Sequence, residues 1–231
     1  MVGGGTGAFI GYVHRVASRI DGDYDLVAGA LSSRPEVALE SGRNLGLADD
    51  RIYTSYEEMA KAEAARPDGI QAVSIVTPNH MHYGPAKAFL EAGIHVICDK
   101  PITTTIEDAR KLAAIQPKNG ARFLLTHNYT GYPLIRQARE LVQSGALGKI
   151  RVIQAEYPQD WLTEATTDDN KQASWRTDPA RSGAGGAIGD IGTHAYNLAR
   201  FVTGLKTDSV SADLTSFVEG RQLDDNVHIM L

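Results

Sequence analysis

The feature that most constrains the fold is an alternation of short apolar runs with longer helical patterns. Four runs are apolar throughout rather than alternating, as in strands buried on both faces of a parallel sheet. These runs cover residues 25–31, 71–76, 95–99 and 122–127. Two of the helical patterns between them begin with capping boxes, Ser55 with Glu58 and Thr104 with Glu107. The alternation predicts βαβ units and an α/β fold with a Rossmann-type doubly wound parallel sheet.

The order of elements changes after Gly148, where a polar, irregular stretch interrupts the pattern. The elements expected from there on are a strand, a helix and two further strands, over residues 149–157, 186–203, 208–218 and 226–231. We therefore expect residues 1–127 to form the first domain and residues 128–231 to begin an α+β domain. We also expect a piece of a longer protein, because a glycine motif that normally follows a strand begins at Gly3.

Net charge, the length of the apolar runs and the cysteine count bear on the possible partners and on the cellular compartment. A net charge of −5 gives no reason to expect nucleic acid or an anionic membrane surface as a partner. The longest apolar runs are too short to span a bilayer. The single cysteine, Cys98, has no partner for an internal disulfide, which fits a reducing compartment. We expect a cytoplasmic protein.

A glycine-rich stretch, GGGTGAFIG, precedes the first helical pattern. Glycines at a strand–helix junction let the backbone approach a pyrophosphate, which the helix N-terminus attracts. Gly3 and Gly5 match the first two positions of G-x-G-x-x-G, and either Ala8 or Gly11 takes the third. A plain glycine-rich turn is the competing interpretation. The residues expected to bind the cofactor here are Gly3, Gly5, Thr6, Ala8, Phe9 and Ile10.

The end of the second predicted strand bears on the choice between NAD and NADP. It ends in Ser32, Ser33 and Arg34, without the acidic residue that usually binds the ribose of NAD. Two hydroxyls and an arginine suit a 2′-phosphate, so we expect NADP to bind at least as well as NAD. The alternative is that Ser33 only caps the next helix and Arg34 is solvated.

Two polar turns follow later strands, at the sheet edge where open α/β folds bind ligands. A lysine held in the second turn, Lys100 before Pro101, can donate to a substrate oxygen, although it can also be an ordinary surface lysine. His80 and His82 have no third ligand nearby, so we expect no metal. The residues expected to line the nicotinamide end are Thr77, Pro78, Asn79 and His82.

The stretch GDIGTHAYN places an acid, Asp190, four residues before a histidine, His194, among apolar and small residues. On a helix, residues four apart share a face. Histidine is the natural proton acceptor near neutral pH, and an aspartate one turn away can orient it. The alternative is structural, with Asp190 favoured by the helix macrodipole and His194 a satisfied buried histidine.

Taken together, the stretches GGGTGAFIG, AVSIVTPNHMH, VICDKP and SGAGGAIGDIGTH resemble the Gfo/Idh/MocA family of NAD(P)-dependent oxidoreductases. These enzymes act largely on sugars and cyclitols. The resemblance implies that Lys100, Asp190 and His194 are catalytic. Asp99 stands where the family usually has glutamate and joins Lys100 in the cofactor site. Many members have an aspartate where this chain has Asn197.

The resemblance also implies a second domain with a large open antiparallel sheet, incomplete in this chain, that usually makes a homo-oligomer contact. The implied reaction is oxidation of a secondary alcohol of a sugar, cyclitol or related polyol by NAD or NADP. A glycosidase of the same fold with a tightly held NAD, and a non-catalytic cofactor-binding fragment, are alternatives. Trp175 also has a simple packing interpretation. The expected substrate contacts are Asn128, Tyr129, Trp175, Arg176 and Asn197.

Overall fold

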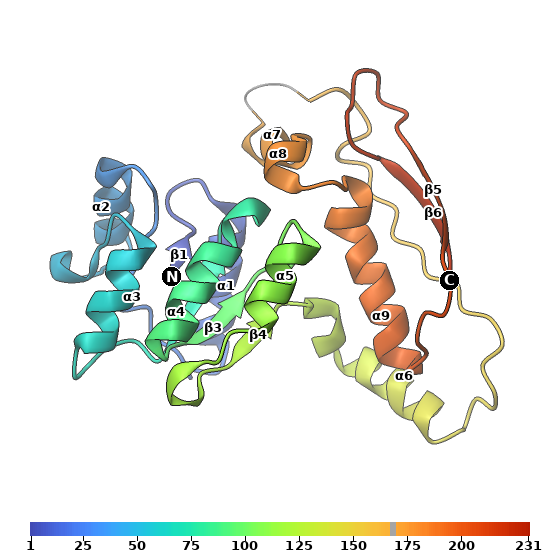
Figure 1. Cartoon of the computed structure of the whole chain (residues 1–231), viewed down its shortest axis with the longest axis horizontal. Helices are drawn as coiled ribbons and strands as arrows, with labels where there is room; N and C mark the ends of the chain where they lie inside the picture. Colours follow the sequence, from blue (N-terminus) through green and yellow to red (C-terminus); the bar gives the residue numbers. More distant parts are fainter. Residues whose placement is uncertain (167–169) are drawn as a thin grey trace. The chain divides into compact units, whose positions relative to one another are not determined.

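The computed structural model describes residues 1–166 and 170–231, which fold into two compact units (Figure 1). The first unit is Met1–Thr126 and the second is His127–Leu231. Each unit brings together its own set of the residues singled out above.

A parallel sheet forms the centre of the first unit, with strand order β1-β2-β3-β4. The strands are β1 Val2–Gly3, β2 Ala72–Val76, β3 His95–Cys98 and β4 Phe123–Leu125. Isolated bridges extend the sheet beyond β1, from Val2 to Ala30 and from Gly29 to Ile52. The segments therefore follow the 3-2-1-4-5-6 order of a dinucleotide-binding sheet.

The strand predicted over residues 25–31 is wrong in extent, since within that run only Gly29 and Ala30 form bridges. The physical reason is that β1 offers only two residues for pairing. Tyr24 and Val27, on the approach to this segment, are exposed.

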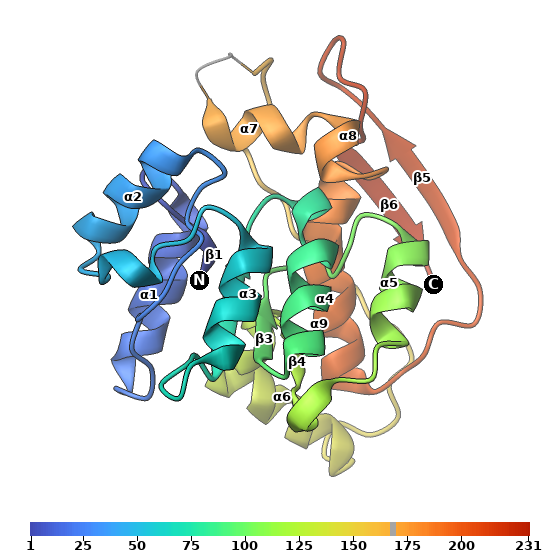
Figure 2. The ribbon, with the colours of Figure 1, turned by 60° about the vertical axis from the view of Figure 1, so that its left-hand side comes forward.

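Helices cover both faces of this sheet. They are α1 Phe9–Ile20, α2 Pro35–Asn44, α3 Tyr56–Ala65, α4 Tyr83–Ala92 and α5 Ile106–Ala113. The helices α3, α4 and α5 lie side by side over one face (Figures 1 and 2). The core beneath them contains Val73 and Ile75 of β2 packed with Phe89 of α4. Ser74 points to the opposite face, where its hydroxyl lies 2.8 Å from Nδ1 of His14 on α1.

The two predicted capping boxes have different outcomes. Ser55 caps α3 as predicted, because its hydroxyl accepts from the backbone N–H of Glu58 at 3.1 Å. For α5 the prediction is wrong by one residue. Thr105 rather than Thr104 is the cap, accepting from the N–H of Asp108 at 3.2 Å, since the helix begins at Ile106.

The second unit joins helices to a small antiparallel sheet. Its elements are α6 Pro133–Gln143, α7 Lys171–Arg176, α8 Pro179–Ser182, a π-helical turn Ile188–Gly192, α9 Thr193–Thr203, β5 Ser211–Thr215 and β6 Asn226–Met230. Helix α6 packs against α9. Strands β5 and β6 form a two-stranded ribbon in which Ser211 pairs with Met230. Strand β6 also contacts the π turn.

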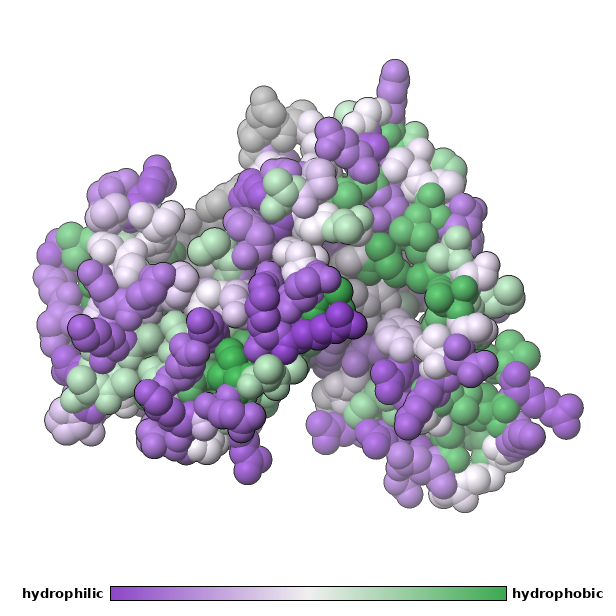
Figure 3. All heavy atoms as spheres, in the orientation of Figure 1, coloured by the Kyte–Doolittle hydropathy of each residue, from purple (hydrophilic) through white to green (hydrophobic). Residues whose placement is uncertain are grey.

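The strand predicted over residues 149–157 is wrong, because this fully described run contains no strand. Val152 is 85% exposed and no strand lies alongside it in the described part of the chain. Hydrophobic side chains also reach the surface of the second unit around the ribbon (Figure 3). Phe217, beyond β5, and Met230 in β6 are strongly exposed.

Within residues 1–166 and 170–231, none of the helices has the length and apolarity to cross a bilayer. No group of three or more histidine, cysteine or acidic residues is arranged to hold a metal ion in these ranges.

Candidate active site

The glycine-rich loop between β1 and α1 is shaped by close backbone contacts. Gly3 and Gly4 adopt φ values of 74° and 77°, the left-handed region that favours glycine. A Cβ on Gly11 would lie 2.4 Å from the Cα of Gly4. Gly11 therefore permits the close packing of helix against loop that the third glycine of the motif provides, while Ala8 is the N-cap residue of α1.

The start of α1 suits an anion. Ala8 makes no side-chain cap bond and the first turn holds no acidic residue, so its N–H groups face no competing negative charge. Phe9 in this turn is 65% exposed, whereas Ile10 packs against a small core of Met1, Leu31, Leu47 and Val76.

Ser41 of α2 supports the loop and was missed in the sequence, where no motif marks it. Its hydroxyl accepts from the backbone N–H of Thr6 at 3.0 Å and lies 3.1 Å from the hydroxyl of Thr6. Ser41 is 2% exposed. A Cβ on Gly5 would lie 2.9 Å from the Ser41 hydroxyl, so Gly5 allows this contact.

The segment expected to meet the ribose is open to solvent at Arg34. The Arg34 guanidinium is exposed and lies 3.9 Å from Glu36. The hydroxyl of Ser32 accepts from the backbone N–H of Arg34 at 3.1 Å. Helix α2 begins after Arg34 as its N-cap and has no side-chain cap bond, so Ser33 does not cap it.

His82 joins the two polar turns within the first unit. Its ring is fully buried, with Nδ1 2.6 Å from the carbonyl oxygen of Pro101 and Nε2 3.0 Å from that of Thr77. Burial lowers the pKa of His82, although both carbonyl contacts act in the opposite direction. Both ring nitrogens thus face the protein backbone, between the turn after β2 and the turn that carries Lys100.

Asp99 fixes the backbone at Lys100. Its Oδ1 accepts from the N–H of Lys100 at 3.0 Å and from the hydroxyl of Thr126 at 2.8 Å. The same turn is anchored to β2, since the N–H of Asp99 donates to the carbonyl of Ile75 at 3.0 Å. The remaining residues of this group lie in the first turn: Thr77 donates to the carbonyl of Met81, and Asn79 is buried.

In the second unit, Asp190 lies in the π turn and His194 in the first turn of α9. The helix predicted over about residues 186–203 is confirmed, but its first part is a π-helical turn that the sequence did not reveal. Short π-helical turns inside helices are frequent at functional sites. Asp190 accepts at Oδ2 from Nε of Arg176 at 3.1 Å, and both side chains are about one-fifth exposed. Arg176 in turn lies over the ring of Trp175 at 4.2 Å.

Aromatic rings surround His194, which is only 9% exposed. Its ring meets that of Tyr129 edge-on with centroids 4.8 Å apart, and that of His127 edge-on at 5.9 Å. The Tyr129 hydroxyl forms a short hydrogen bond with Tyr157, which was missed as a site residue because it was assigned to a strand. That bond and burial raise the pKa of Tyr129 to about 12. An imidazole beside neutral phenols can accept a proton in a site with little water.

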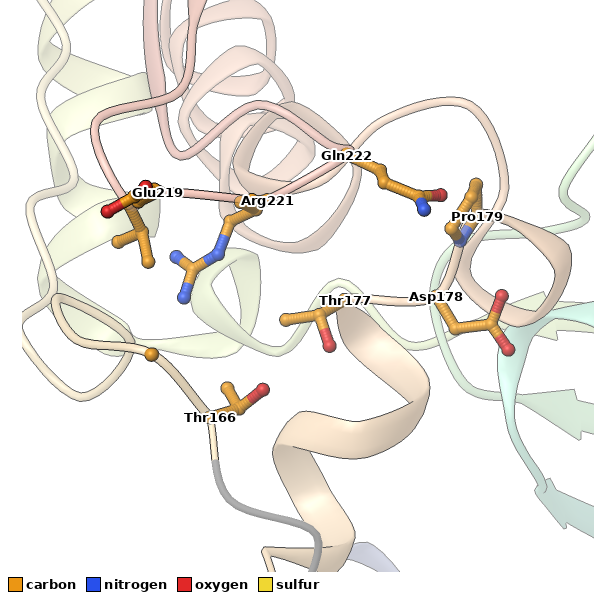
Figure 4. A pocket seen from close by; sticks show the side chains of 10 residues that line it. Thr166, Thr177, Asp178, Pro179, Glu219, Arg221 and Gln222 are labelled. Atoms are coloured by element: carbon orange, nitrogen blue, oxygen red, sulfur yellow. The ribbon is translucent and has the colours of Figure 1, made fainter.

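The other expected substrate residues are less closely gathered. Asn128 opens a short helical turn and is exposed, and Asn197 is half-buried one turn after His194 on α9. A hollow of about 420 Å³ lies elsewhere in this unit, between the α7–α8 junction and the 218–222 turn (Figure 4). Neither Asp190 nor His194 lines it.

Comparison with known proteins accounts for both units. Residues 1–129 match the oxidoreductase family with an NAD-binding Rossmann fold, and residues 135–231 match the Gfo/Idh/MocA C-terminal domain. The chain belongs to the Gfo/Idh/MocA oxidoreductase family. The Rossmann-like parallel sheet and the resemblance inferred from the sequence motifs are thus confirmed.

Three relatives illustrate the similarity. An oxidoreductase from Sinorhizobium meliloti is 56% identical with a TM-score of 0.87, over 99% of this chain and 58% of that one. An inositol dehydrogenase homolog complexed with NAD+ from Azotobacter vinelandii is 38% identical with a TM-score of 0.95, over 99% and 59%. Levoglucosan dehydrogenase from Pseudarthrobacter phenanthrenivorans is 32% identical, over 96% of this chain and 55% of the relative. This chain spans less than two thirds of each relative's length.

Proposed function

We propose that the protein containing this chain oxidises a secondary alcohol of a sugar, cyclitol or related polyol with NAD or NADP. The observation that carries the proposal is the pairing of Asp190 with Arg176 one turn before the buried His194. Relatives named for inositol and levoglucosan support the substrate class. Residues 1–127 would bind the cofactor, and residues 128–231 would begin the substrate domain.

The first unit fits a dinucleotide. The left-handed glycines and the uncapped, acid-free start of α1 provide N–H groups and space for a pyrophosphate. The exposed Arg34 guanidinium is available to a 2′-phosphate, which supports binding of NADP at least as well as NAD. The cofactor-binding residues that we propose are those expected from the sequence, with Gly11 and Ser41 supporting the loop.

The chain's own residues then have distinct roles in the proposed reaction. The nicotinamide, when bound, would supply the acceptor for the hydride, the hydrogen with its electron pair, that leaves the carbinol carbon. His194 takes the proton from the substrate hydroxyl, for which neutral imidazole is suited near pH 7. Lys100 stabilises developing negative charge on a substrate oxygen. Asp190, oriented by Arg176, positions the substrate, and the Tyr129 ring covers one side of His194.

Compartment and assembly belong to the same proposal. Cys98, buried in β3, is the chain's single cysteine and cannot form an internal disulfide, which supports a reducing, cytoplasmic location. Exposed hydrophobic side chains in and next to the two-stranded ribbon, Met230 in β6 and Phe217 beyond β5, support homo-oligomer contacts on this side of the second unit.

The test is an assay of the purified protein containing this chain with NAD+ or NADP+ and a panel of sugars, inositols and anhydrosugars. We expect net formation of reduced cofactor with at least one polyol. Cleavage of a glycoside without net reduced cofactor would instead identify the glycosidase alternative. Cofactor binding without any turnover would identify a non-catalytic protein and contradict the proposal.

A further inference from the structure

Asp224, in the connection that leads into β6, binds three consecutive backbone N–H groups of the segment before Asp190. Its carboxylate accepts from Gly186 at Oδ1 and from Ile188 at Oδ2, both at 2.7 Å. Its carbonyl oxygen accepts from the N–H of Ala187 at 2.8 Å. Asp224 is only 9% exposed, so these contacts are shielded from water.

Gly186 is the residue that permits this approach. A Cβ at position 186 would lie 2.2 Å from the carbonyl oxygen of Asp224 and 2.9 Å from the Cβ of Leu223. No side chain fits at such distances, so only glycine can occupy position 186 while Asp224 makes these contacts. The glycine-rich approach to the helix is thereby explained by a contact with a residue 38 positions later.

The contact reaches Asp190 through one further hydrogen bond. The N–H of Asp190 donates to the carbonyl of Gly186 at 3.0 Å. Gly186 therefore binds Asp224 through its N–H and Asp190 through its carbonyl oxygen. The carboxylate also faces the N-terminal end of the π turn and α9, where negative charge is favoured. Hydrogen bonds to an ionised carboxylate are stronger than those between neutral groups.

We propose that Asp224 is a positioning residue, which fixes the start of the π turn and thereby the placement of Asp190 and His194. Its effect on turnover rests on the function proposed above, whereas its effect on the local backbone does not. Asp224 touches neither of the two proposed catalytic side chains in this arrangement, and it acts through Gly186 and Ile188.

The neighbouring Asp225 offers a matched control. It also accepts from two backbone N–H groups, those of Phe217 at 2.8 Å and Val218 at 3.1 Å. Asp225 also pairs with Nη1 of Arg221 at 3.4 Å, within the same turn of the ribbon. None of these contacts involves the segment before Asp190. Replacing either aspartate by asparagine removes one charge and leaves an NH2 group facing a backbone donor.

The experiment compares the unmodified protein with Asp224→Asn and Asp225→Asn by amide hydrogen exchange and by steady-state kinetics. In the unmodified protein we expect slow exchange at residues 186–188. In Asp224→Asn we expect faster exchange there and a fall in kcat of about tenfold to a hundredfold, because small displacements of catalytic groups are costly. The KM for the cofactor should stay unchanged within about twofold, since the cofactor-binding residues that we propose belong to the first unit and Asp224 to the second.

In Asp225→Asn, faster exchange should be confined to residues 216–219, with kcat within about twofold of the unmodified protein. Fast exchange at 186–188 in the unmodified protein would overturn the proposal, and this measurement needs no variant to fold. Equal losses of kcat in both variants would also overturn it, since they would indicate general destabilisation. If no polyol is oxidised by the unmodified protein, the proposed function fails, while the exchange measurements still decide the role of Asp224.

Discussion

Nε of Arg176 donates to Oδ2 of Asp190 at 3.1 Å, joining α7 to the π turn before α9. The guanidinium is itself held in place. Its Nη1 donates to the backbone and side-chain oxygens of Gln172, both at 3.0 Å. The rings of Trp175 and Trp161 lie 4.2 and 5.4 Å from it. Arg176 therefore orients Asp190. The sequence led us to expect Arg176 as a substrate contact, and the structure shows that it also holds Asp190 in place.

Replacing Arg176 by alanine should lower kcat/KM for the polyol by about tenfold to a hundredfold, because a hydrogen bond to a charged group contributes about 1.5–3 kcal/mol. The measurement is steady-state kinetics with cofactor saturating. Arg200→Ala is the matched control, since Arg200 lies on α9, is exposed and has Tyr196 as its aromatic neighbour. Equal, small effects of both substitutions would show that the Arg176–Asp190 pair does not serve catalysis.

Replacing Arg34 by alanine should raise the Kd for NADP by about tenfold while the Kd for NAD changes little, because one ionic contact to the 2′-phosphate is lost. Titration of both cofactors measures this. Arg43→Ala provides the control, because Arg43 lies on the same helix and is paired with Asp49 at 2.7 Å. A strong preference for NAD that persists in Arg34→Ala would rule out the proposed role.

Replacing Glu63 by glutamine should destabilise the first unit by about 1–3 kcal/mol, because buried hydrogen-bond donors lose their charged acceptor while Arg51 keeps Asp68, at 3.7 Å, as an ion-pair partner. Glu63 is 1% exposed and accepts from Arg51, from the Tyr53 hydroxyl at 2.8 Å and from the N–H of Ile70 at 3.1 Å. Urea unfolding at pH 7 checks this, with the exposed Glu40→Gln as control. A variant as stable as Glu40→Gln would contradict the expectation.

The stabilisation that the Glu63 carboxylate provides should depend on pH. Burial by itself would raise the pKa of Glu63, but hydrogen bonds from Arg51 and Tyr53 hold it below the ordinary value. The stabilisation is therefore complete above the unfolded pKa of about 4.3 and is lost as the pH falls through the lower folded value. The gap in unfolding free energy between the unmodified protein and Glu63→Gln should narrow in that acidic range. A gap independent of pH would argue against the ion pair.

The buried His82 should make the free energy of unfolding depend on pH in a second acidic range. Burial lowers its pKa in the folded state, so the unfolded state takes up the proton first as the pH falls below about 6.5. Stability should therefore decrease below that pH, by at most about 1.4 kcal/mol per pH unit for one proton. His82→Gln should show a shallower decrease than the exposed control His80→Gln. Stability that instead increases on acidification would mean that the two carbonyl contacts outweigh burial.

Local patterns were sufficient for most of the first unit. The apolar runs of β2 and β3 place Val73, Ile75 and Val96 in the core of the parallel sheet, and Ser55 binds a donor three residues away. The run at 25–31 was overextended, because only Gly29 and Ala30 within it bridge to neighbouring segments. The run at 149–157 has a strand-like composition, but a segment becomes a strand only when its backbone pairs with a neighbouring strand.

The candidate site also combines features that the sequence revealed with features that depend on tertiary contacts. The spacing of Asp190 and His194 was visible in the sequence, but the π turn between them was not. That turn depends on Asp224, which is 36 positions after Ile188, and on Arg176 from another helix. Such contacts arise from tertiary structure and leave no local pattern. The burial of His82 between two carbonyl oxygens is a further example.

The most direct test of the proposed function is the rate of reduced-cofactor formation by the unmodified protein and by His194→Ala on the same polyol. We expect the unmodified protein to form reduced cofactor and His194→Ala to do so about a hundredfold to ten-thousandfold more slowly, because a positioned general base contributes that much. Cofactor affinity should be the same in both. A His194→Ala variant with unreduced turnover would contradict the assignment of His194 as the proton acceptor.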